Sequence, residues 1–297
     1  MRILLIGANG QLGTDLLRVF RAGGHHLVQL THAEVDICNG QQIADVMAEA
    51  KPEIVLNTAA FHKVEECERK PDLAFQVNAS AVMNLALACK QATAVLVHFS
   101  TDYVFGGYSR HTPYEVEDLP APVNVYGASK LVGEHLIAFN CERYFVIRTC
   151  GLYGRAGSSG KGGNFVENIL KKAMAGEPIR VVDDQVLTPT YTADLAQAVG
   201  RLVVTNRFGL YHLSSEGQCS WFEFSQAILE YAGIRANLSP VKTSEFYSPV
   251  KRPAYSVLSK AKFNSLGMSI PSWKDALPRY LEERKNKATA AEKPVMA

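Results

Sequence analysis

The sequence predicts an α/β protein built on a doubly wound, parallel β-sheet, with a smaller α/β region after it. Three observations lead to this prediction. Over the first 150 of the 297 residues, short apolar runs alternate with longer amphipathic stretches, a glycine-rich turn joins the first run to the first such stretch, and the alternation changes after residue 150. Strands and helices at this spacing are typical of βαβ units, whose right-handed crossovers wind a parallel sheet.

Five apolar runs in this first part have the length of strands. The stretches between them place apolar residues on one face of a helix, as Leu12, Leu16 and Phe20 do. Pro52 breaks the chain after the second helix, whereas Pro71 opens the third at a position where proline is tolerated. The expected strands are Arg2–Ile6, Leu27–Leu30, Ile54–Leu56, Val95–Ser100 and Tyr144–Arg148, and the expected helices are Gln11–Ala22, Gln41–Ala50, Pro71–Gln91 and Ala128–Phe139.

The second half of the chain is less regular. Six glycines within Gly151–Gly163 predict a mobile loop. The expected helices after it are Asn164–Ala175, Ala193–Val204, Trp221–Ala232 and Trp273–Glu283, with short strands at Ile179–Val182 and Leu210–Leu213. The expected division is a first domain of residues 1–150 and about 178–208, a second domain of 151–177 and 209–284, and a disordered, Lys/Ala/Glu-rich tail of 285–297.

Composition and charge exclude several classes of protein. The chain has 31 basic and 29 acidic residues, and this net charge of +2 argues against a nucleic-acid-binding surface. No apolar run reaches the ~20 residues of a membrane span, and the apolar start of the chain runs into glycines after five residues, so that neither membrane insertion nor secretion is expected. The six cysteines form no CxxC pair, which indicates neither a zinc site nor a disulfide framework but buried thiols in a reducing, cytoplasmic compartment.

A glycine turn, Gly7-Ala8-Asn9-Gly10-Gln11-Leu12-Gly13, lies between the first strand and the first helix. Its glycines let the backbone turn tightly and let a pyrophosphate approach the helix N-terminus, where free N–H groups attract anions. A glycine triplet alone is weak evidence, and a purely structural turn is the alternative. The position between a strand and a helix favours nucleotide binding and a Rossmann-like first domain.

The end of the second strand bears on the choice of nucleotide. Leu30-Thr31-His32 contains no acidic residue that could bind a ribose 2′-hydroxyl, and this absence favours NADP over NAD, with NAD left open. His32 is either a neighbour of the phosphate or an exposed surface residue. Asp36 either accepts a hydrogen bond from the adenine amino group, with Ile37 against the base, or serves as a turn residue or helix cap.

Tyr126 and Lys130 lie four residues apart near the start of an expected helix, which stacks their side chains on one face. A neighbouring ammonium stabilises a phenolate, so that Lys130 is expected to lower the pKa of Tyr126 and to prepare it for proton transfer to a ketone oxygen as hydride reaches the carbon. Thr101, at the end of the fourth strand, can donate to the same oxygen. An amphipathic helix with an exposed lysine is the alternative. We expect His98 in the core, together with Trp221 and Phe224.

These motifs resemble those of the extended short-chain dehydrogenase/reductases and, within them, the dTDP-4-dehydrorhamnose reductase family. The resemblance covers residues 1 to about 283. The glycine turn and the Tyr–Lys pair mark only the superfamily, whereas three other elements are more specific. The segments that carry it are GANGQLG at Gly7–Gly13, STDYVF at Ser100–Phe105, NVYGASK at Asn124–Lys130, DDQVLTPTYTADLA at Asp183–Ala196, GLYHLSSEGQCSWFEF at Gly209–Phe224 and RPAYSVLS at Arg252–Ser259.

The resemblance implies an NADPH- or NADH-dependent reduction of the 4-keto group of dTDP-4-dehydro-L-rhamnose to dTDP-L-rhamnose, a polysaccharide precursor. The first domain would bind NAD(P) and the second the dTDP-linked sugar. Thr101, Tyr126 and Lys130 would be catalytic. The cofactor would be held by Gly7, Asn9, Gly10, Gln11, Leu12, Gly13, Asp36, Ile37, Ala59, Ala60, Ser100, Tyr126 and Lys130, and the substrate by Thr101, Asn164, Thr188, Pro189 and Arg252.

One departure concerns the substrate. Gly151 stands where members of the family carry a tryptophan, which leaves room for a larger or differently oriented sugar. Arg252 could contact the ligand or form a structural ion pair. The family's metal-linked acids are matched only loosely, by Asp15 and Asp194, so we expect no metal; a homodimer is left open.

Two other functions are alternatives to this reductase activity. The β subunit of methionine adenosyltransferase suggests an NADP-binding regulatory module, against which the Tyr126–Lys130 pair favours an enzyme. An epimerase or dehydratase is the other alternative. Dehydratases carry an Asp-Glu pair beside the threonine, and Thr101-Asp102 lacks it.

Overall fold

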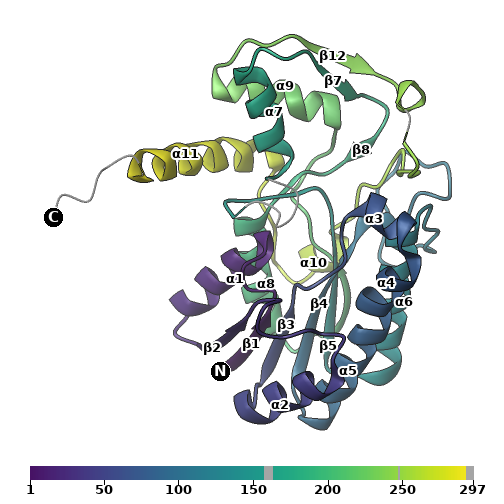
Figure 1. Cartoon of the computed structure of the whole chain (residues 1–297), viewed down its shortest axis with the longest axis vertical. Helices are drawn as coiled ribbons and strands as arrows, with labels where there is room; N and C mark the ends of the chain where they lie inside the picture. The colour runs from purple at the N-terminus through teal and green to yellow at the C-terminus, as the bar shows by residue number, and fades with distance from the viewer. Residues whose placement is uncertain (157–162, 247, 292–297) are drawn as a thin grey trace.

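The main sheet of the protein has six parallel strands in the order β10-β5-β4-β3-β1-β2 (Figure 1). The structure is a computed structural model that describes residues 1–156, 163–246 and 248–291. The strand order reverses between β1 and β3, the point at which parallel α/β sheets open a crevice for ligands. The strands are β1 Arg2–Ile6, β2 His26–Leu30, β3 Ile54–Asn57, β4 Val95–Thr101, β5 Tyr144–Thr149 and β10 Gly209–His212.

Helices cover both faces of this sheet. Ile3 and Leu5 of β1 face a core shared with α1 and α8, and Leu4 and Ile6 face a core shared with α2, α5 and α6. Residues along a strand alternate between faces, so a strand buried on both sides is apolar throughout. The predicted doubly wound sheet is therefore confirmed. The helices are α1 Gln11–Ala22, α2 Gly40–Ala50, α5 Ala81–Gln91, α6 Val125–Asn140 and α8 Thr192–Val203.

A smaller α/β region lies beyond the carboxyl ends of the main strands (Figure 1). Its core includes Phe224, Trp273 and Tyr280, each buried. Its helices are α7 Phe165–Met174, α9 Trp221–Ala232 and α11 Trp273–Ala291, beside the parallel pair β7 Ile179–Val182 and β12 Leu238–Val241. Two further pairs are β6 Leu152–Tyr153 with β9 Thr190–Tyr191, and β8 Val186–Leu187 with β11 Cys219–Ser220.

Two strands belong to a different sheet from the one that the sequence predicts. The sequence places residues 178–208 with the main sheet, yet β7 pairs with β12, and Ile179 and Val181 pack into the core of the smaller region. It places residues 209–284 with the smaller region, yet β10 pairs with β5 at the edge of the main sheet. A short apolar run predicts a strand but not its partner, because pairing is a contact between distant parts of the chain.

The helix expected over Pro71–Gln91 is interrupted by a π-helical turn, η1 (Gln76–Ser80), between α4 (Pro71–Phe75) and α5. Asn78 in this turn accepts a hydrogen bond from the Phe61 N–H and donates one to the Phe61 carbonyl, each at 2.9 Å. A π turn inserts one residue and thereby redirects a side chain, here toward the loop after β3.

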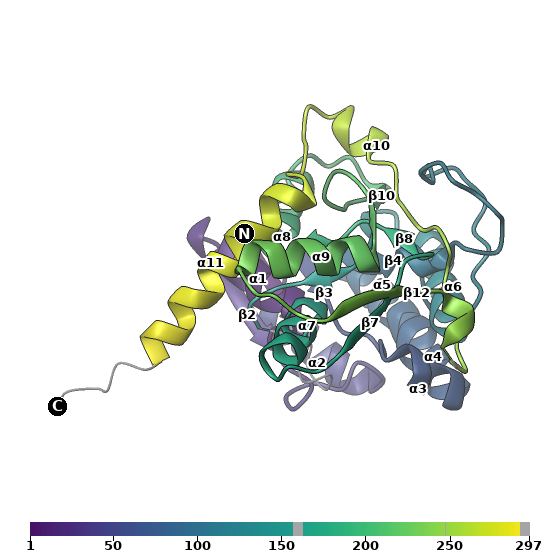
Figure 2. The same cartoon turned by 90° about the horizontal axis from the view of Figure 1, so that it is seen from above.

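The two segments expected to lack structure are partly ordered. Residues 152–153 of the expected loop form β6, and residues 157–162 lie outside the described residues. The tail, expected to be disordered from residue 285, continues α11 to Ala291, because Lys, Ala and Glu are also strong helix formers; 292–297 lie outside the described residues. Figure 2 shows α11 projecting from the body. None of the described helices is long and apolar enough to cross a membrane.

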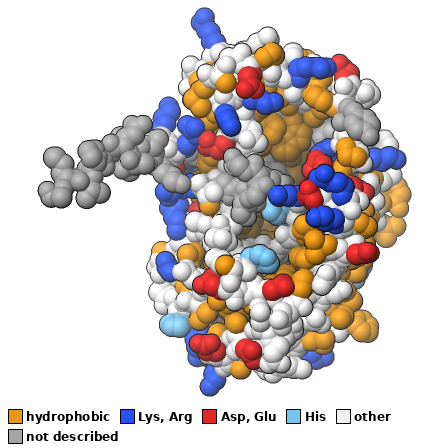
Figure 3. All heavy atoms as spheres, in the orientation of Figure 1, with side chains coloured by type: hydrophobic (Ala, Val, Ile, Leu, Met, Phe, Trp, Pro, Cys, Tyr) orange, Lys and Arg blue, Asp and Glu red, His pale blue; other side chains and the backbone are white. Residues whose placement is uncertain are grey.

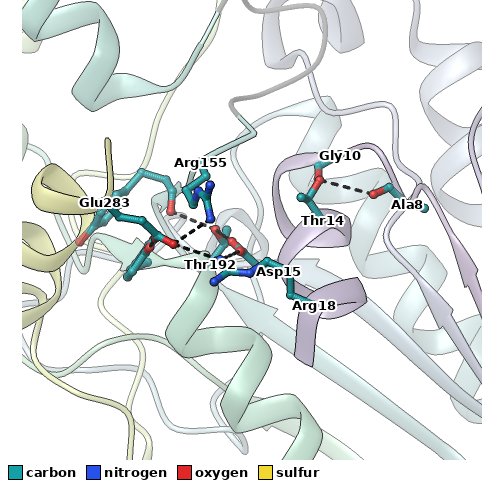
Figure 4. A network of polar contacts seen from close by, with 10 residues as sticks. Ala8, Gly10, Thr14, Asp15, Arg18, Arg155, Thr192 and Glu283 are labelled. Carbon is teal, nitrogen blue, oxygen red and sulfur yellow. Dashed lines mark hydrogen bonds and ion pairs between the residues drawn. The ribbon is translucent and has the colours of Figure 1, made fainter. Parts of the chain in front are cut away.

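A polar network ties α1 to α8 and α11 (Figure 4). Asp15 is buried; its carboxylate accepts from Thr192 Oγ1 at 2.6 Å and lies 3.4 Å from the Arg18 guanidinium. Arg18 also pairs with Glu283 at 3.2 Å, and Arg155 pairs with the same carboxylate at 2.9 Å. No group of three or more potential metal ligands occurs among the described residues.

Asp15→Asn is expected to flatten the fall in stability with rising pH. Burial raises the pKa of Asp15, so the folded protein binds this proton more tightly than the unfolded chain does. Stability from this group is therefore complete below the ordinary aspartate pKa of ~3.9 and is lost as pH rises through the raised one. The difference in free energy of unfolding between variant and parent, measured with urea at several pH values, should move in favour of the variant as pH rises; a constant difference would contradict this.

Candidate active site

A large cavity of ≈ 1620 Å³ opens at the carboxyl ends of the main strands and is lined by both parts of the chain. Figure 3 shows the face on which it opens: hydrophobic side chains line the hollow, and basic and acidic side chains gather beside it. Its walls come from the glycine turn, the ends of β3, β4 and β5, the start of α6, and the segments around α7, β7 and α9. This size and position fit two ligands held end to end.

The glycine turn between β1 and α1 forms one end of the cavity. Gly7 has a φ of +83°, and a Cβ there would lie 2.5 Å from Thr58 Oγ1; a Cβ on Gly13 would lie 2.2 Å from the Gly7 carbonyl oxygen. Only glycine permits this approach. Gly10 is the N-cap of α1, which begins at Gln11, and no side chain caps the helix. Its free N–H groups therefore fit the pyrophosphate of a dinucleotide.

The loop after β2 forms the wall beside the glycine turn. His32, Asp36 and Ile37 all line the cavity, and Ile37 is largely buried. One carboxylate oxygen of Asp36 accepts from the Cys38 N–H at 2.9 Å, whereas Asn39 caps α2. Asp36 is thus a turn residue and not the helix cap.

Two other polar atoms in the cavity wall lack a partner among the described residues. They are Gln11 Oε1 and Thr149 Oγ1, both buried. Buried polar atoms are normally hydrogen-bonded, so these atoms fit contacts with a bound ligand. Thr149 lies at the end of β5, directly beside Thr101 of β4. The sequence reasoning missed Thr149, although a threonine that follows an expected strand in a parallel sheet is a usable signal.

Thr101 and Tyr126 meet at the base of the cavity. Thr101 ends β4, and its hydroxyl donates to Asp102 Oδ1 at 3.1 Å and lies close enough to the phenol of Tyr126 to oppose the rise in its pKa. Tyr126 lies in the first turn of α6, where Asn124 caps the helix by accepting from the Gly127 N–H at 2.8 Å. Burial raises the pKa of Tyr126, so the phenol remains protonated at neutral pH.

Lys130 lies one turn further along α6, as predicted, but it does not line the cavity. Its Nζ is 2.9 Å from His98 Nε2, and burial lowers the pKa of Lys130 to about 7. The expectation that Lys130 lowers the pKa of Tyr126 is therefore wrong for this structure. Burial disfavours the charged form of each group, so the tyrosine pKa rises while the lysine pKa falls.

Most of the predicted site residues meet in this one cavity. They come from seven segments that are distant in sequence, and the first four of these lie at the carboxyl ends of β1 to β4, which a parallel sheet brings together. The predicted residues that line it are Gly7, Asn9, Gly10, Gln11, Leu12, Gly13, Asp36, Ile37, Ala59, Ala60, Ser100, Thr101, Tyr126, Asn164 and Arg252.

Two predicted substrate residues do not line the cavity. Thr188 is fully buried, and its hydroxyl donates to the Gly217 carbonyl at 2.8 Å. Pro189 packs behind Gly151. Asn164 lines the cavity, but its amide is engaged in the fold, since Oδ1 caps α7 and Nδ2 donates to the Gly154 carbonyl at 2.9 Å. A sequence motif predicts that such residues lie near a site, but it does not predict which of their atoms face that site.

Arg252 forms a structural ion pair and also faces the cavity. Its guanidinium pairs with Glu65 of α3 (Val64–Arg69), a helix that the sequence analysis did not predict, and donates to Ser248 Oγ at 2.9 Å. Because Arg252 and Glu65 both line the cavity, this pair joins the two parts of the molecule beside the opening.

Asp102 was not selected from the sequence, although it lies within the quoted STDYVF segment. It is buried beside Thr101 and accepts from Ser256 Oγ at 2.6 Å and from Cys150 Sγ at 3.1 Å. Ser256 belongs to the RPAYSVLS segment, so Asp102 connects two motifs that are far apart in sequence. Burial raises the pKa of Asp102, and the three hydroxyl and thiol donors around it oppose that shift.

An aromatic pair lines the cavity near the position of the missing tryptophan. Trp221 and Phe165 have ring centroids 4.3 Å apart, and both line the cavity, whereas Phe224 is fully buried. The prediction of a core position is thus confirmed for Phe224 but incomplete for Trp221. Gly151 has a φ of +56°, and a Cβ there would lie 3.0 Å from Leu187 Cδ1.

Comparisons with known proteins agree with one another over nearly the whole chain. Residues 1–286 match the family model of the RmlD substrate binding domain. The spore coat polysaccharide biosynthesis protein SpsK of Bacillus subtilis (strain 168) is 40% identical over 95% of this chain and 98% of its own length. The dTDP-4-dehydrorhamnose reductase of Mycolicibacterium smegmatis is 36% identical over 93% of this chain and 84% of its own length.

Solved structures show the same likeness. The dTDP-4-dehydrorhamnose reductase of Bacillus anthracis in complex with NADP has a TM-score of 0.90 and 38% identity, covering 95% of this chain and 99% of that one. The UDP-glucose 4-epimerase of Thermus thermophilus in complex with NAD has a TM-score of 0.84 at 21% identity, over 96% of this chain and 99% of that one. The second likeness concerns the fold alone.

Proposed function

This chain belongs to the dTDP-4-dehydrorhamnose reductase family, whose model is that of the RmlD substrate binding domain, and we propose that it reduces the 4-keto group of a dTDP-linked deoxysugar with NADPH. It is an oxidoreductase of the extended short-chain dehydrogenase/reductase type, and NADP is its cofactor. The reaction that we propose first is the reduction of dTDP-4-dehydro-L-rhamnose to dTDP-L-rhamnose, a polysaccharide precursor.

The observation that carries the proposal is the meeting of two hydroxyls at the base of the cavity. Thr101 and Tyr126 both line the cavity, and the Thr101 hydroxyl lies close enough to the phenol to oppose the rise in its pKa, with the glycine turn and the smaller region also in the lining. A ketone that enters from the smaller region would reach both hydroxyls while a dinucleotide occupies the glycine turn. Both ligands would then share the cavity of ≈ 1620 Å³.

When bound, NADPH supplies a hydride to the keto carbon. The chain must then supply one proton to the oxygen to complete the alcohol. Tyr126 is the donor in this proposal, because its raised pKa keeps it protonated at the pH of reduction. Thr101 can hold the oxygen beside the phenol once its hydroxyl, which donates to Asp102 Oδ1 at 3.1 Å in this structure, turns to donate to the keto oxygen instead.

The glycine turn and Asp36 would hold the cofactor, and the smaller region would hold the nucleotide sugar. Trp221 of α9 and Phe165 of α7 line the same cavity as Gly151, and these helices offer the aromatic surface that the family carries at position 151. A sugar face bound there would lie in a different orientation. The substrate could therefore be a 4-keto-6-deoxy sugar other than the one that is reduced in rhamnose synthesis. The experiment below distinguishes between these substrates.

The test is a panel of dTDP-linked 4-keto-6-deoxy sugars with NADPH, followed by the loss of NADPH absorbance and by identification of the product. Turnover with dTDP-4-dehydro-L-rhamnose above the other sugars supports the proposal. Turnover only with another sugar would replace the substrate but keep the reaction. Binding of NADPH without consumption across the panel would contradict the proposal and would support a regulatory, NADP-binding module.

Gly151→Ala is expected to destabilise the protein by about 1–3 kcal/mol, because the residue would need a left-handed backbone and its Cβ would press on Leu187. Gly176 is a matched control, since it has a φ of +69° and no atom within 4 Å of an added Cβ. Gly176→Ala should show the backbone cost alone. Urea unfolding of both variants measures the difference, and equal losses would show that crowding at Gly151 contributes nothing.

A further inference from the structure

The carboxyl of Asp102 joins three segments of the chain beside Thr101. Its Oδ2 accepts hydrogen bonds from Ser256 Oγ at 2.6 Å and from Cys150 Sγ at 3.1 Å, whereas its Oδ1 lies 3.1 Å from Thr101 Oγ1. Asp102 is only 4% exposed. The two oxygens of this carboxyl therefore have different surroundings, since Oδ2 takes two donors and Oδ1 meets a single hydroxyl.

No cation forms an ion pair with this carboxyl in the part of the chain that the structure describes. Its hydrogen-bonding neighbours are two hydroxyls and a thiol, all uncharged. The phenols of Tyr103 and Tyr126 also feel this carboxyl, and burial raises the pKa of both; Arg252 acts on Tyr103 but is paired with Glu65. An unpaired buried charge is costly, and burial accordingly raises the pKa of Asp102.

The hydrogen bonds of Thr101 depend on the charge of this neighbour. A hydroxyl has one proton to donate and two lone pairs that accept, and the Tyr103 N–H already donates to Thr101 Oγ1 at 3.1 Å. An ionised Asp102 can only accept, so it draws the single proton of Thr101 away from a ligand. A proton on Asp102 Oδ1 would instead donate to the second lone pair of Thr101. The separation of 3.1 Å fits both directions, because it does not show which oxygen carries the proton.

We propose that Asp102 is a positioning residue that acts as a neutral acid: its Oδ1–H donates to Thr101 Oγ1, so that Thr101 turns its own proton into the cavity and donates it to the keto oxygen. Oδ2 then remains the acceptor for Ser256 and Cys150, and every polar atom of the group has a partner. Ionisation of Asp102 reverses its bond to Thr101 and withdraws that donor from the substrate. This proposal deepens the proposed function, because it states how the reductase site presents its second donor.

The first test uses the cofactor-free protein and needs no substrate. An infrared difference spectrum between the parent and Asp102→Asn at neutral pH should show the C=O stretch of one protonated carboxyl, which the variant loses. Asp15→Asn, at another buried aspartate, should leave this band in place. Carboxylate bands in its stead would overturn the proposal. This reading does not depend on whether the protein turns over any sugar, so its failure is distinct from failure of the proposed function.

The second test compares two variants of Asp102. Asp102→Asn keeps an N–H donor toward Thr101 and an oxygen toward Ser256 and Cys150, whereas Asp102→Ala keeps neither. At neutral pH kcat of Asp102→Asn should exceed that of Asp102→Ala by about tenfold or more, because outright loss of such a donor costs about 10²–10³-fold. The fall of kcat that accompanies ionisation of Asp102 at rising pH should be absent from Asp102→Asn. Equal kcat values for the two variants, or an unchanged pH profile in Asp102→Asn, would overturn the proposal.

Ser256→Ala tests the same group without altering it. The Ser256 hydroxyl stabilises the ionised form of Asp102, so its removal should raise the pKa of Asp102 further and move the alkaline fall of kcat to higher pH. Ser225→Ala is the matched control, since this buried hydroxyl donates to the Trp221 carbonyl at 2.8 Å, and it should lower stability without moving the profile. A profile that Ser256→Ala leaves in place or moves to lower pH would show that Asp102 is merely structural.

Discussion

Tyr126→Phe is expected to lower kcat by about 10²-fold or more, because it removes the hydroxyl that gives a proton to the keto oxygen. The phenyl ring keeps the packing of α6 against the base of the cavity, so NADPH affinity and thermal stability should change little. kcat and kcat/KM should fall together, since the lost interaction acts in the transition state. Steady-state rates and NADPH titration of the same preparation provide the measurement.

A neighbouring tyrosine provides the control for this variant. Tyr103 also lines the cavity, and its ring centroid lies 6.0 Å from that of Tyr126, but its hydrogen bond with Thr101 comes from its backbone N–H and not from its hydroxyl. Tyr103→Phe should therefore cost far less in kcat. A Tyr126→Phe enzyme as fast as the parent would refute the proton-transfer role.

The dependence of kcat on pH also tests the proton-transfer role of Tyr126. Burial raises the pKa of Tyr126, so the donor form persists to a pH above the ordinary tyrosine value of ~10. Reduction should not fall in the neutral range through loss of this proton. A loss of kcat with a midpoint near 7 would instead belong to Lys130, whose pKa is about 7.

Glu134→Ala is expected to destabilise the protein by about 3–5 kcal/mol. Glu134 and Arg148 form a buried ion pair with contacts of 2.7 to 3.1 Å, and Ser100 Oγ donates to the same carboxylate. Removal of the carboxylate leaves the Arg148 charge buried without its partner. Urea unfolding measures the loss, provided that the variant folds.

Two further variants make this prediction specific. The double variant Glu134→Leu/Arg148→Met removes both charges and should recover much of the stability, because no charge remains unpaired. Glu245→Ala breaks the exposed Arg180–Glu245 pair, whose side chains are 51% and 50% exposed, and should cost less than about 1 kcal/mol. A loss at Glu134 as small as that at Glu245 would show that solvent reaches the buried pair.

The elements set by local pattern were predictable from the sequence. The apolar runs predicted β1 and α1 with the bounds that the structure shows, and the glycines between them predicted the turn. The spacing of Tyr126 and Lys130 placed both on one helix. In each case the cause lies within a few residues, either in the periodicity of burial or in the backbone freedom of glycine.

The features that depend on distant contacts were not predictable in this way. Nothing local to Lys130 indicates that its amine meets His98, because their contact is made by packing of α6 on β4. Asp102 becomes recognisable only when Ser256, 154 residues later, reaches it. Trp221 has helical spacing that fits the core, and only the position of α9 above the cavity reveals that one side of its ring faces a ligand site.

The path of the chain through the two sheets has a consequence for engineering. The chain leaves the main sheet after β5, enters the smaller region, and returns to deliver β10 beside β5 before it leaves again for α9. No single cut in the chain separates the smaller region, which would hold the sugar, from the region of the main sheet, which would hold the dinucleotide. A chimaera that borrows another sugar specificity must therefore be spliced at several junctions, and a truncation at one of them would strip an edge strand from the half that remains.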